Sequence, residues 1–352
     1  MIQIDTLEEV LYSRYDKNEF PALLEQINLW REEKPLDGIK ILDATPVFFN
    51  TGLKYLALLS AGADLTICAH PDLPSDPEAA EFFRSCGIPV IASESDGAFD
   101  CVCDCAGMNK TTASKYGVVE LTGSGAHAYR NWNHPVFLAD GGRVKVLETG
   151  LGTGNGLLRA LNRLGFSDIS GREILIFGGG KVGSGVALAL DGAGAHCTIV
   201  DRLDCIRCKS TKVSRISIDN TGEIKNHISK CYGIVTATGI KNAVSEYADD
   251  MLASGALLMN IGVEDEYGKG IPDERVLNRK MPLNFILEEP TLLCYIDPTM
   301  ALSNYGTIEL LNKRCSNGIN LPPEELENRL LDAVGRGSAA ADLTKLEEFY
   351  YE

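Results

Sequence analysis

The sequence has few basic residues, few histidines and no long apolar run. It carries 33 Lys and Arg against 49 Asp and Glu, a formal net charge of −16, and a charge of this sign repels nucleic-acid phosphates and anionic lipid surfaces. No apolar run approaches the roughly 20 residues that span a bilayer, and the first residues include neither a basic segment nor a signal-peptide core. We therefore expect a cytoplasmic protein that binds neither nucleic acid nor membrane.

Cysteine is not scarce, but its pattern excludes a disulfide scaffold. The eleven cysteines are odd in number and scattered over 352 residues, which is typical of reduced thiols in a cytosolic protein. Cys101, Cys103 and Cys105 alternate along a predicted strand, so we expect them to share one face and to pack as small apolar groups. For these three, and for the pair Cys205 and Cys208, the sequence supplies no further ligands at a zinc or iron–sulfur spacing. We predict no metal site, and leave open whether either group has a role beyond packing.

The order of apolar segments predicts two α/β domains. A length of 352 residues suits two domains of roughly 100–200 residues, and short apolar strands that alternate with helices favour doubly wound parallel sheets. Strands are predicted at 38–43, 63–68, 88–92, 99–103, 173–177, 197–200, 233–236, 257–260 and 292–295. We assign residues 1–150 and about 299–330 to a substrate domain, 151–298 to a Rossmann domain and 331–352 to a short tail. A cleft between the two domains is the expected active site.

Residues 178–183 satisfy the pattern G-x-G-x-x-G between an apolar strand and a helix of small residues. Gly178 permits the tight turn, Gly180 lets the backbone approach a pyrophosphate, and Gly183 lets helix and strand pack closely. The next predicted strand ends in Asp201, and an acid there accepts hydrogen bonds from the adenosine ribose and disfavours a 2′-phosphate. We predict an NAD site here; the alternatives are a bare glycine turn and, because Arg202 follows the acid, NADP.

Further motifs resemble those of the S-adenosylhomocysteine hydrolase family over nearly the whole chain. Val-Thr-Ala-Thr-Gly at 235–239 and Met-Asn-Ile-Gly at 259–262 are similar to the family's V-T-x-T-G and x-N-I-G, and Ser303-Asn304 to its S-N-S segment. Weaker similarities lie at residues 20–24, 34–38, 62–64, 86–90 and 152–154. The resemblance implies that further residues contact NAD: Lys181, Val182, Thr238, Gly239, Asn260, Gly262, Asn304 and Thr122.

The resemblance also implies a chemistry and an assembly. In that family a tightly held NAD oxidises the ribose 3′-hydroxyl, the 5′ substituent is eliminated, water adds, and the hydride returns to the sugar. The cofactor is therefore regenerated in each turnover. The family's proteins form tetramers, and a C-terminal K-x-x-x-Y segment, before which this sequence stops, reaches a neighbouring subunit's cofactor. We expect a homo-oligomer that acts on a small nucleoside or sugar-like substrate.

Several positions depart from the family where its chemistry takes place. The family's catalytic or substrate-binding groups fall on Pro46, Cys105, Leu121, Val263 and Asp297. Proline and valine cannot move protons, and leucine cannot hold a ribose hydroxyl. Counting from Pro135 places the lysine of the family's K-x-x-x-x-D on Lys145, and counting back from Gly152 places its aspartate on Glu148, so the pair is matched only with an altered spacing.

Four residues remain candidates for catalysis. Lys145 is the leading proton-transfer group, because a lysine in a cleft can act as a base when burial or nearby cations lower its pKa. Glu148 would orient or neutralise it, and Asp297 would bind sugar hydroxyls. His127 is the fourth, with a similar place for His134, although each of these four also has a plain structural interpretation.

Three functions follow from this pattern. The preferred one is an NAD-dependent enzyme that oxidises a sugar or nucleoside hydroxyl on a substrate other than S-adenosylhomocysteine, since the cofactor motifs persist and the substrate motifs do not. The alternatives are a genuine adenosylhomocysteinase and a non-catalytic NAD-binding regulator.

Overall fold

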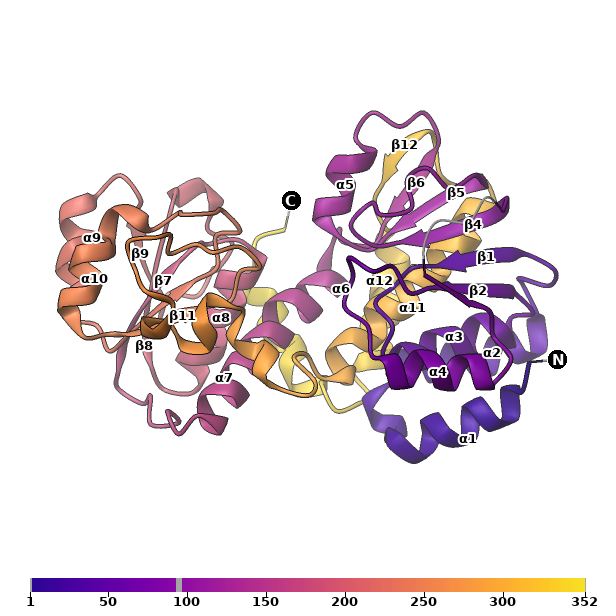
Figure 1. The fold of residues 1–352 in the computed structure, drawn as a ribbon, viewed down its shortest axis with the longest axis horizontal. Coiled ribbons are helices and arrows are strands. Elements are labelled where there is room, and N and C mark those ends of the chain that lie inside the picture. The colour runs from indigo at the N-terminus through magenta and orange to yellow at the C-terminus, as the bar shows by residue number, and fades with distance from the viewer. Residues whose placement is uncertain (1, 93–96, 352) are drawn as a thin grey trace. The chain divides into compact units, whose positions relative to one another are not determined.

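The computed structural model describes residues 2–92 and 97–351, which form two compact units (Figure 1). The first unit comprises Met1–Lys145 and Ile296–Ala341, and the second comprises Val146–Tyr295 and Asp342–Glu352. The sequence prediction places its divisions at 150, 298 and 330. In the structure the last eleven residues belong to the second unit and do not form a separate tail.

The first unit is built on a seven-stranded parallel sheet. Its strands, in spatial order, are β12 (Gly318–Asn320), β6 (Pro135–Leu138), β5 (Ser114–Glu120), β4 (Phe99–Asp104), β1 (Lys40–Asp43), β2 (Asp64–Cys68) and β3 (Val90–Ile91). The helices of this unit are α1 (Ile4–Arg14), α2 (Pro21–Glu33), α3 (Thr51–Ser60), α4 (Pro77–Ser85), α5 (Gly123–Tyr129), most of α11 (Leu293–Leu311) and α12 (Glu324–Val334). In its central strands, three of the four residues of β1 and the last four of the six residues of β4 are buried, as expected for a sheet covered on both faces.

The second unit is built on a five-stranded parallel sheet in the order β11-β10-β7-β8-β9. These strands are Leu257–Asn260, Gly233–Thr236, Glu173–Phe177, His196–Asp201 and Ser214–Ser217. Its helices are α7 (Thr153–Arg163), α8 (Lys181–Gly192), α9 (Thr221–Ile228) and α10 (Ala248–Ser254), and its core gathers apolar residues from 175 to 276. The chain order reverses at β7, which places the switch point between β7 and β10. The prediction of two doubly wound parallel-sheet domains is confirmed.

One continuous helical run passes from the first unit into the second. It consists of α6 (Arg143–Val146), the π-helical segment η2 (Leu147–Gly152) and α7. A π-helical turn has i→i+5 hydrogen bonds and so takes up one more residue than an α-turn, and such turns often occur at functional sites. Glu148 lies on this segment, and Lys145 lies two residues before its first residue.

The strand predicted at 292–295 is wrong, because α11 begins at Leu293 and includes the rest of this run. The apolar run Leu292–Tyr295 is too short to distinguish a strand from a buried helical turn, and Pro298, which argues for a helix boundary, lies inside the helix. The sequence prediction also lacks the strands β5, β6, β9 and β12. They are short or begin with polar residues or proline, and their pairing with neighbours in the sheet defines them. Within the described residues, no helix is both long and apolar enough to cross a membrane.

Candidate functional site

A cavity of about 920 Å³ opens in the second unit at the carboxyl ends of β7, β8 and β10. Its lining includes Gly178, Gly180, Asp201 and Thr238 from the predicted cofactor site. In doubly wound sheets, ligands bind outside the carboxyl ends of the strands next to the switch point. Position in the fold and sequence motif therefore indicate the same site.

The three glycines of the motif differ in what surrounds them. Gly178 follows β7 with a φ of +104°, and a Cβ there would lie 2.4 Å from the carbonyl oxygen of Ala237. A Cβ on Gly183 would lie 1.9 Å from the carbonyl oxygen of Gly178, so no side chain fits between helix and turn. At Gly180, by contrast, a Cβ would meet no atom within 4 Å. The loop is therefore packed against the protein at Gly178 and Gly183 but is free of neighbours at Gly180, the N-cap of α8. A pyrophosphate can approach the backbone amides of the helix N-terminus at this point.

Asp201 connects the glycine loop to the end of β8. Its Oδ2 accepts a hydrogen bond from the amide of Gly179 at 2.7 Å, and its Oδ1 accepts one from the amide of Arg202 at 2.7 Å. Each carboxylate oxygen retains a second acceptor position for a ribose hydroxyl. The guanidinium of Arg202 is paired with Asp204 at 2.9 Å. These groups fit the adenosine half of NAD.

The loop after β10 is shaped by a carboxylate that the sequence analysis does not single out. Glu266 is fully buried, and its oxygens accept hydrogen bonds from the amide and hydroxyl of Thr238, at 2.9 and 2.7 Å, and from the amide of Gly239 at 2.8 Å. Burial raises the pKa of Glu266, and these hydrogen bonds act against that rise. Glu266 therefore holds Thr238 at the cavity wall. A single acid within a loop gives no sequence signal for this role.

Asn260 and Gly262 organise the neighbouring loop. The side-chain amide of Asn260 donates to the carbonyls of Gly262, Glu264 and Lys280, at 3.0, 2.8 and 2.6 Å, and its Oδ1 accepts from the amide of Gly262 at 3.0 Å. Neither residue is among the described residues that line the cavity. Lys181 and Val182, the first two residues of α8, are also absent from that lining.

Two residues assigned to the cofactor by resemblance lie in the first unit. Asn304 is fully buried on α11, where its side-chain amide donates to Gln26 at 2.8 Å and to the carbonyl of Lys54 at 3.3 Å. Thr122 is the N-cap of α5: its hydroxyl oxygen accepts from the amide of Gly125 at 3.0 Å and the hydroxyl donates to Glu120 at 2.7 Å. Both side chains therefore have structural partners within their own unit.

Asp297 is engaged in the packing of α11 against α2. The residue is fully buried, and its two carboxylate oxygens accept hydrogen bonds from the amides of Ala22 and Leu23, at 2.9 and 2.8 Å. These amides belong to the first turn of α2, where backbone donors have no partner within the helix. Burial raises the pKa of Asp297 to about 7, against the opposing effect of the two amides. Binding of a sugar hydroxyl by Asp297 stays a prediction.

The other catalytic candidates occupy three different environments. Lys145, on α6, is only 3% exposed although lysine is seldom buried. Glu148 lies on the π-helical segment η2. His127 is exposed on α5, with a ring nitrogen 3.1 Å from the guanidinium of Arg130, and His134 is exposed beside Trp132. Among these residues, Lys145 is the one whose burial calls for an explanation.

The structure also contains a buried charged pair that the sequence did not reveal. Asp43 ends β1 and Lys54 lies on α3; both are fully buried, and the ammonium group of Lys54 donates to the carboxylate of Asp43. Burial acts to lower the pKa of Lys54, but the charge of Asp43 outweighs it and the pKa is raised. Cys103 lies beside this pair, and burial raises its pKa to about 12.

The two cysteine groups differ in exposure. Cys101, Cys103 and Cys105 are all buried, whereas Cys205 is exposed at the wall of the cavity and Cys208 is buried. Burial also raises the pKa values of Cys101 and Cys208. Across residues 2–92 and 97–351, no three His, Cys, Asp or Glu side chains are grouped so that they could hold a metal ion.

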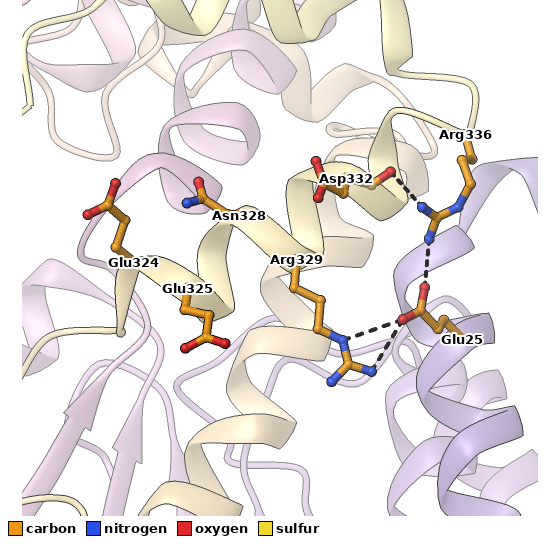
Figure 2. Close-up of a pocket in the computed structure, with 7 residues that line it drawn as sticks. All are labelled: Glu25, Glu324, Glu325, Asn328, Arg329, Asp332 and Arg336. Atoms are coloured by element: carbon orange, nitrogen blue, oxygen red, sulfur yellow. Dashed lines mark hydrogen bonds and ion pairs between the residues drawn. The ribbon is translucent and has the colours of Figure 1, made fainter.

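A second hollow, of about 670 Å³, lies on the surface of the first unit over α12 and α2. Figure 2 shows the guanidinium groups of Arg329 and Arg336 converging on Glu25, at 3.2 and 2.6 Å. These exposed ion pairs contribute about 0–1 kcal/mol each. Because its charged groups bind one another across two helices, this hollow is better explained as a helix contact than as a ligand site.

Comparison with known proteins shows which protein family the second unit resembles. Residues 150–269 match the family model described as "S-adenosyl-L-homocysteine hydrolase, NAD binding domain". Adenosylhomocysteinase of Thermoplasma acidophilum is 25% identical over 308 residues, which cover 77% of this chain and 72% of that enzyme. The enzyme of Sulfolobus acidocaldarius is 27% identical over 306 residues, with 76% and 71% covered.

Among solved structures, a transhydrogenase from Sinorhizobium meliloti matches with a TM-score of 0.44 and 14% identity, covering 78% of this chain and 96% of that one. A dipicolinate synthase chain from Bacillus halodurans matches with a TM-score of 0.46 and 12% identity, covering 78% and 98%. The cofactor of the second unit is NAD. The second unit thus matches the NAD-binding domain of the S-adenosylhomocysteine hydrolase family, and about three quarters of the chain is similar to curated adenosylhomocysteinases.

Proposed function

We propose that the protein is an NAD-dependent enzyme that oxidises a hydroxyl group of a sugar or nucleoside other than S-adenosylhomocysteine. The observation that carries the proposal is the state of Asp297, which stands where the family has a histidine. Its carboxylate is fully buried and hydrogen-bonded to the start of α2, so the group is used to hold two helices together. The NAD loop meanwhile keeps an open face at Gly180.

The altered positions support a changed substrate. Pro46 and Val263 have no ionisable group, and the side chain of Val263 is 81% exposed. A positioned acid or base contributes typically about 10²–10⁴-fold to a rate, so loss of two such groups is hard to combine with the family's full elimination and hydration. A single oxidation of a hydroxyl needs one proton acceptor beside the cofactor.

Lys145 is the proposed proton acceptor. When bound, NAD would supply the hydride acceptor for the carbon that carries the hydroxyl, and the hydroxyl proton would need a neutral base on the protein. Lys145 is 3% exposed, which is the enclosed environment expected of a lysine that acts as a base. Glu148 follows it on the π-helical segment, where the additional residue changes the angular position of its side chain relative to an α-helix. We assign Glu148 an orienting role.

The test is to purify the protein without nucleotide, add NAD, and follow nicotinamide absorbance with a panel of sugars and nucleosides. Lys145→Ala should abolish cofactor reduction without changing the Kd for NAD, and exposed Lys110→Ala is the matched control. Reduction by the Lys145→Ala protein at the wild-type rate would remove Lys145 from the mechanism.

The same experiment separates the two alternatives. Release of homocysteine from S-adenosylhomocysteine would establish hydrolysis, which the names of the relatives favour. Binding of NAD without reduction by any substrate, together with an NAD-dependent change in association with a partner, would establish a regulator.

Two further expectations belong to this proposal. The eleven free cysteines, nine of them buried, support a reducing compartment, the cytoplasm. Assembly into a homo-oligomer stays a prediction, and light scattering after size exclusion measures it.

A further inference from the structure

The last residues of the chain are fixed against one wall of the NAD cavity. After η8 (Ala340–Glu348), Phe349 forms an antiparallel bridge with Cys208 and is fully buried. The amide of Lys209 donates to the carbonyl of Glu348 at 2.7 Å, and the amide of Tyr350 donates to the carbonyl of Arg207 at 2.7 Å. These two bonds flank the bridge, so the terminal segment pairs like a short strand with residues 207–209, which lie between β8 and β9.

This pairing brings two aromatic side chains to the cavity. Tyr350 and Tyr351 line the same 920 Å³ cavity as Gly180 and Asp201. The ammonium group of Lys209 lies 5.1 Å from the centre of the Tyr350 ring, and the hydroxyl of Tyr351 donates to the carbonyl of Leu346. Both rings are thus held from the protein side before any ligand binds, which reduces the entropy lost on binding.

We propose that Tyr350 and Tyr351 are part of the NAD site and close its adenosine end within the same chain. Asp201 at the end of β8 marks the place of the adenosine ribose, and the segment that carries the tyrosines is paired with the chain that follows β8. Aromatic side chains stack on nucleobases with about 1–3 kcal/mol per base. The match to the family's NAD-binding domain ends at residue 269, so this wall lies outside it. The proposal rests on NAD binding and not on the proposed reaction.

The first test compares NAD binding in three variants by calorimetry and by the rate of NADH release. Tyr350→Ala/Tyr351→Ala should bind NAD about tenfold more weakly or worse, and release should be faster by a similar factor. Tyr350→Phe/Tyr351→Phe keeps both aromatic faces and should stay within about threefold of wild type. Tyr232→Ala is the matched control. Tyr232 immediately precedes β10, at the amino ends of the strands, whereas the cavity lies at their carboxyl ends.

Tyr350→Ala alone removes a ring that is 53% exposed, so it tests the wall without disturbing packing, and a loss of at least about threefold is expected. If both alanine variants bind NAD as tightly as wild type and Tyr232→Ala, the proposal is overturned. It is also overturned if the wild-type protein binds no NAD. Turnover is not measured, so absence of activity toward sugars leaves this result unaffected.

The second test separates closure within a chain from closure by a neighbouring copy. Asp201→Ala protein and Tyr350→Ala/Tyr351→Ala protein are mixed under conditions that exchange subunits, and NAD affinity is measured before and after. Closure within one chain predicts no gain of tight sites, because neither chain has a complete site. Recovery of wild-type affinity in part of the sites would show that the tyrosines act on a neighbouring copy and would overturn the proposal.

Discussion

The two units share a parallel-sheet plan but use the polar groups at their strand ends differently. In the second unit, Asp201 and the glycine loop border a cavity of about 920 Å³. In the first unit, the carboxylates of Asp43, Asp104 and Glu120 stand at the ends of β1, β4 and β5 and are all buried. Asp104 accepts hydrogen bonds from Tyr129 and Asn109, and Glu120 accepts them from Thr122 and the amide of Gly107.

This difference shows how one sheet edge can serve either binding or scaffolding. A buried carboxylate must be hydrogen-bonded or paired, and in the first unit those partners are loop amides and neighbouring side chains. The same bonds fix the loops beyond the strands in one conformation. In the second unit Asp201 accepts hydrogen bonds from two backbone amides and also lines the cavity. It can therefore hold the loop and still accept a hydrogen bond from a ligand.

The largest expected effect separates the closed and open glycines of the NAD loop. Gly183→Ala should abolish NAD binding and destabilise the second unit by ~4 kcal/mol or more, because its Cβ would overlap the carbonyl oxygen of Gly178. Gly180→Ala should fold normally, since its Cβ meets no atom, yet weaken NAD binding by filling the approach to the pyrophosphate. Thermal unfolding and calorimetry of both variants check this pair. Equal stability of the two would contradict the assigned packing.

A somewhat smaller effect tests whether the buried charges of the first unit are structural. Lys54→Met leaves the carboxylate of Asp43 buried without its cation, and breaking such a pair costs ~3–5 kcal/mol. Asp43→Asn/Lys54→Met removes both charges and should be less destabilised than the single variant. NAD affinity should not change in either. A loss of NAD affinity with unchanged stability would mean that the pair serves the cofactor and not the scaffold.

The smallest of the three effects is a pH dependence that Asp297 introduces. Its pKa is about 7 in the folded protein and about 3.9 in an unfolded chain, so the folded state binds more protons between these values. The stabilising contribution of Asp297 to the free energy of unfolding is therefore greatest below about pH 4. It falls by on the order of 2–4 kcal/mol as pH rises to about 7. Asp297→Asn should remove this fall in denaturant titrations from pH 4 to 8. An unchanged slope would contradict the raised pKa.

Local sequence signals account for most of the strands and for the glycine loop that borders the cavity. Strands such as 173–177 and 197–200 were predictable because continuous apolar runs between helices indicate buried parallel strands. β12 and β9 were not, because a three- or four-residue strand is defined by its neighbour and not by its own composition. Gly178 and Gly183 stand where a Cβ would overlap a carbonyl oxygen, whereas Glu266 acts from a loop whose path no local pattern specifies.

The sequence by itself determined the NAD loop and the sheet type, because tight turns, close helix packing and buried strands each restrict residue type at fixed spacing. Tertiary structure decided what the remaining polar residues do. Asp297 and Asn304 are separated from their partners Leu23 and Gln26 on α2 by 274 and 278 positions. The two terminal tyrosines reach the cavity through pairing with residues about 140 positions away. Contacts of such long range follow from how elements pack, and a side chain's partners are fixed only when that packing is complete.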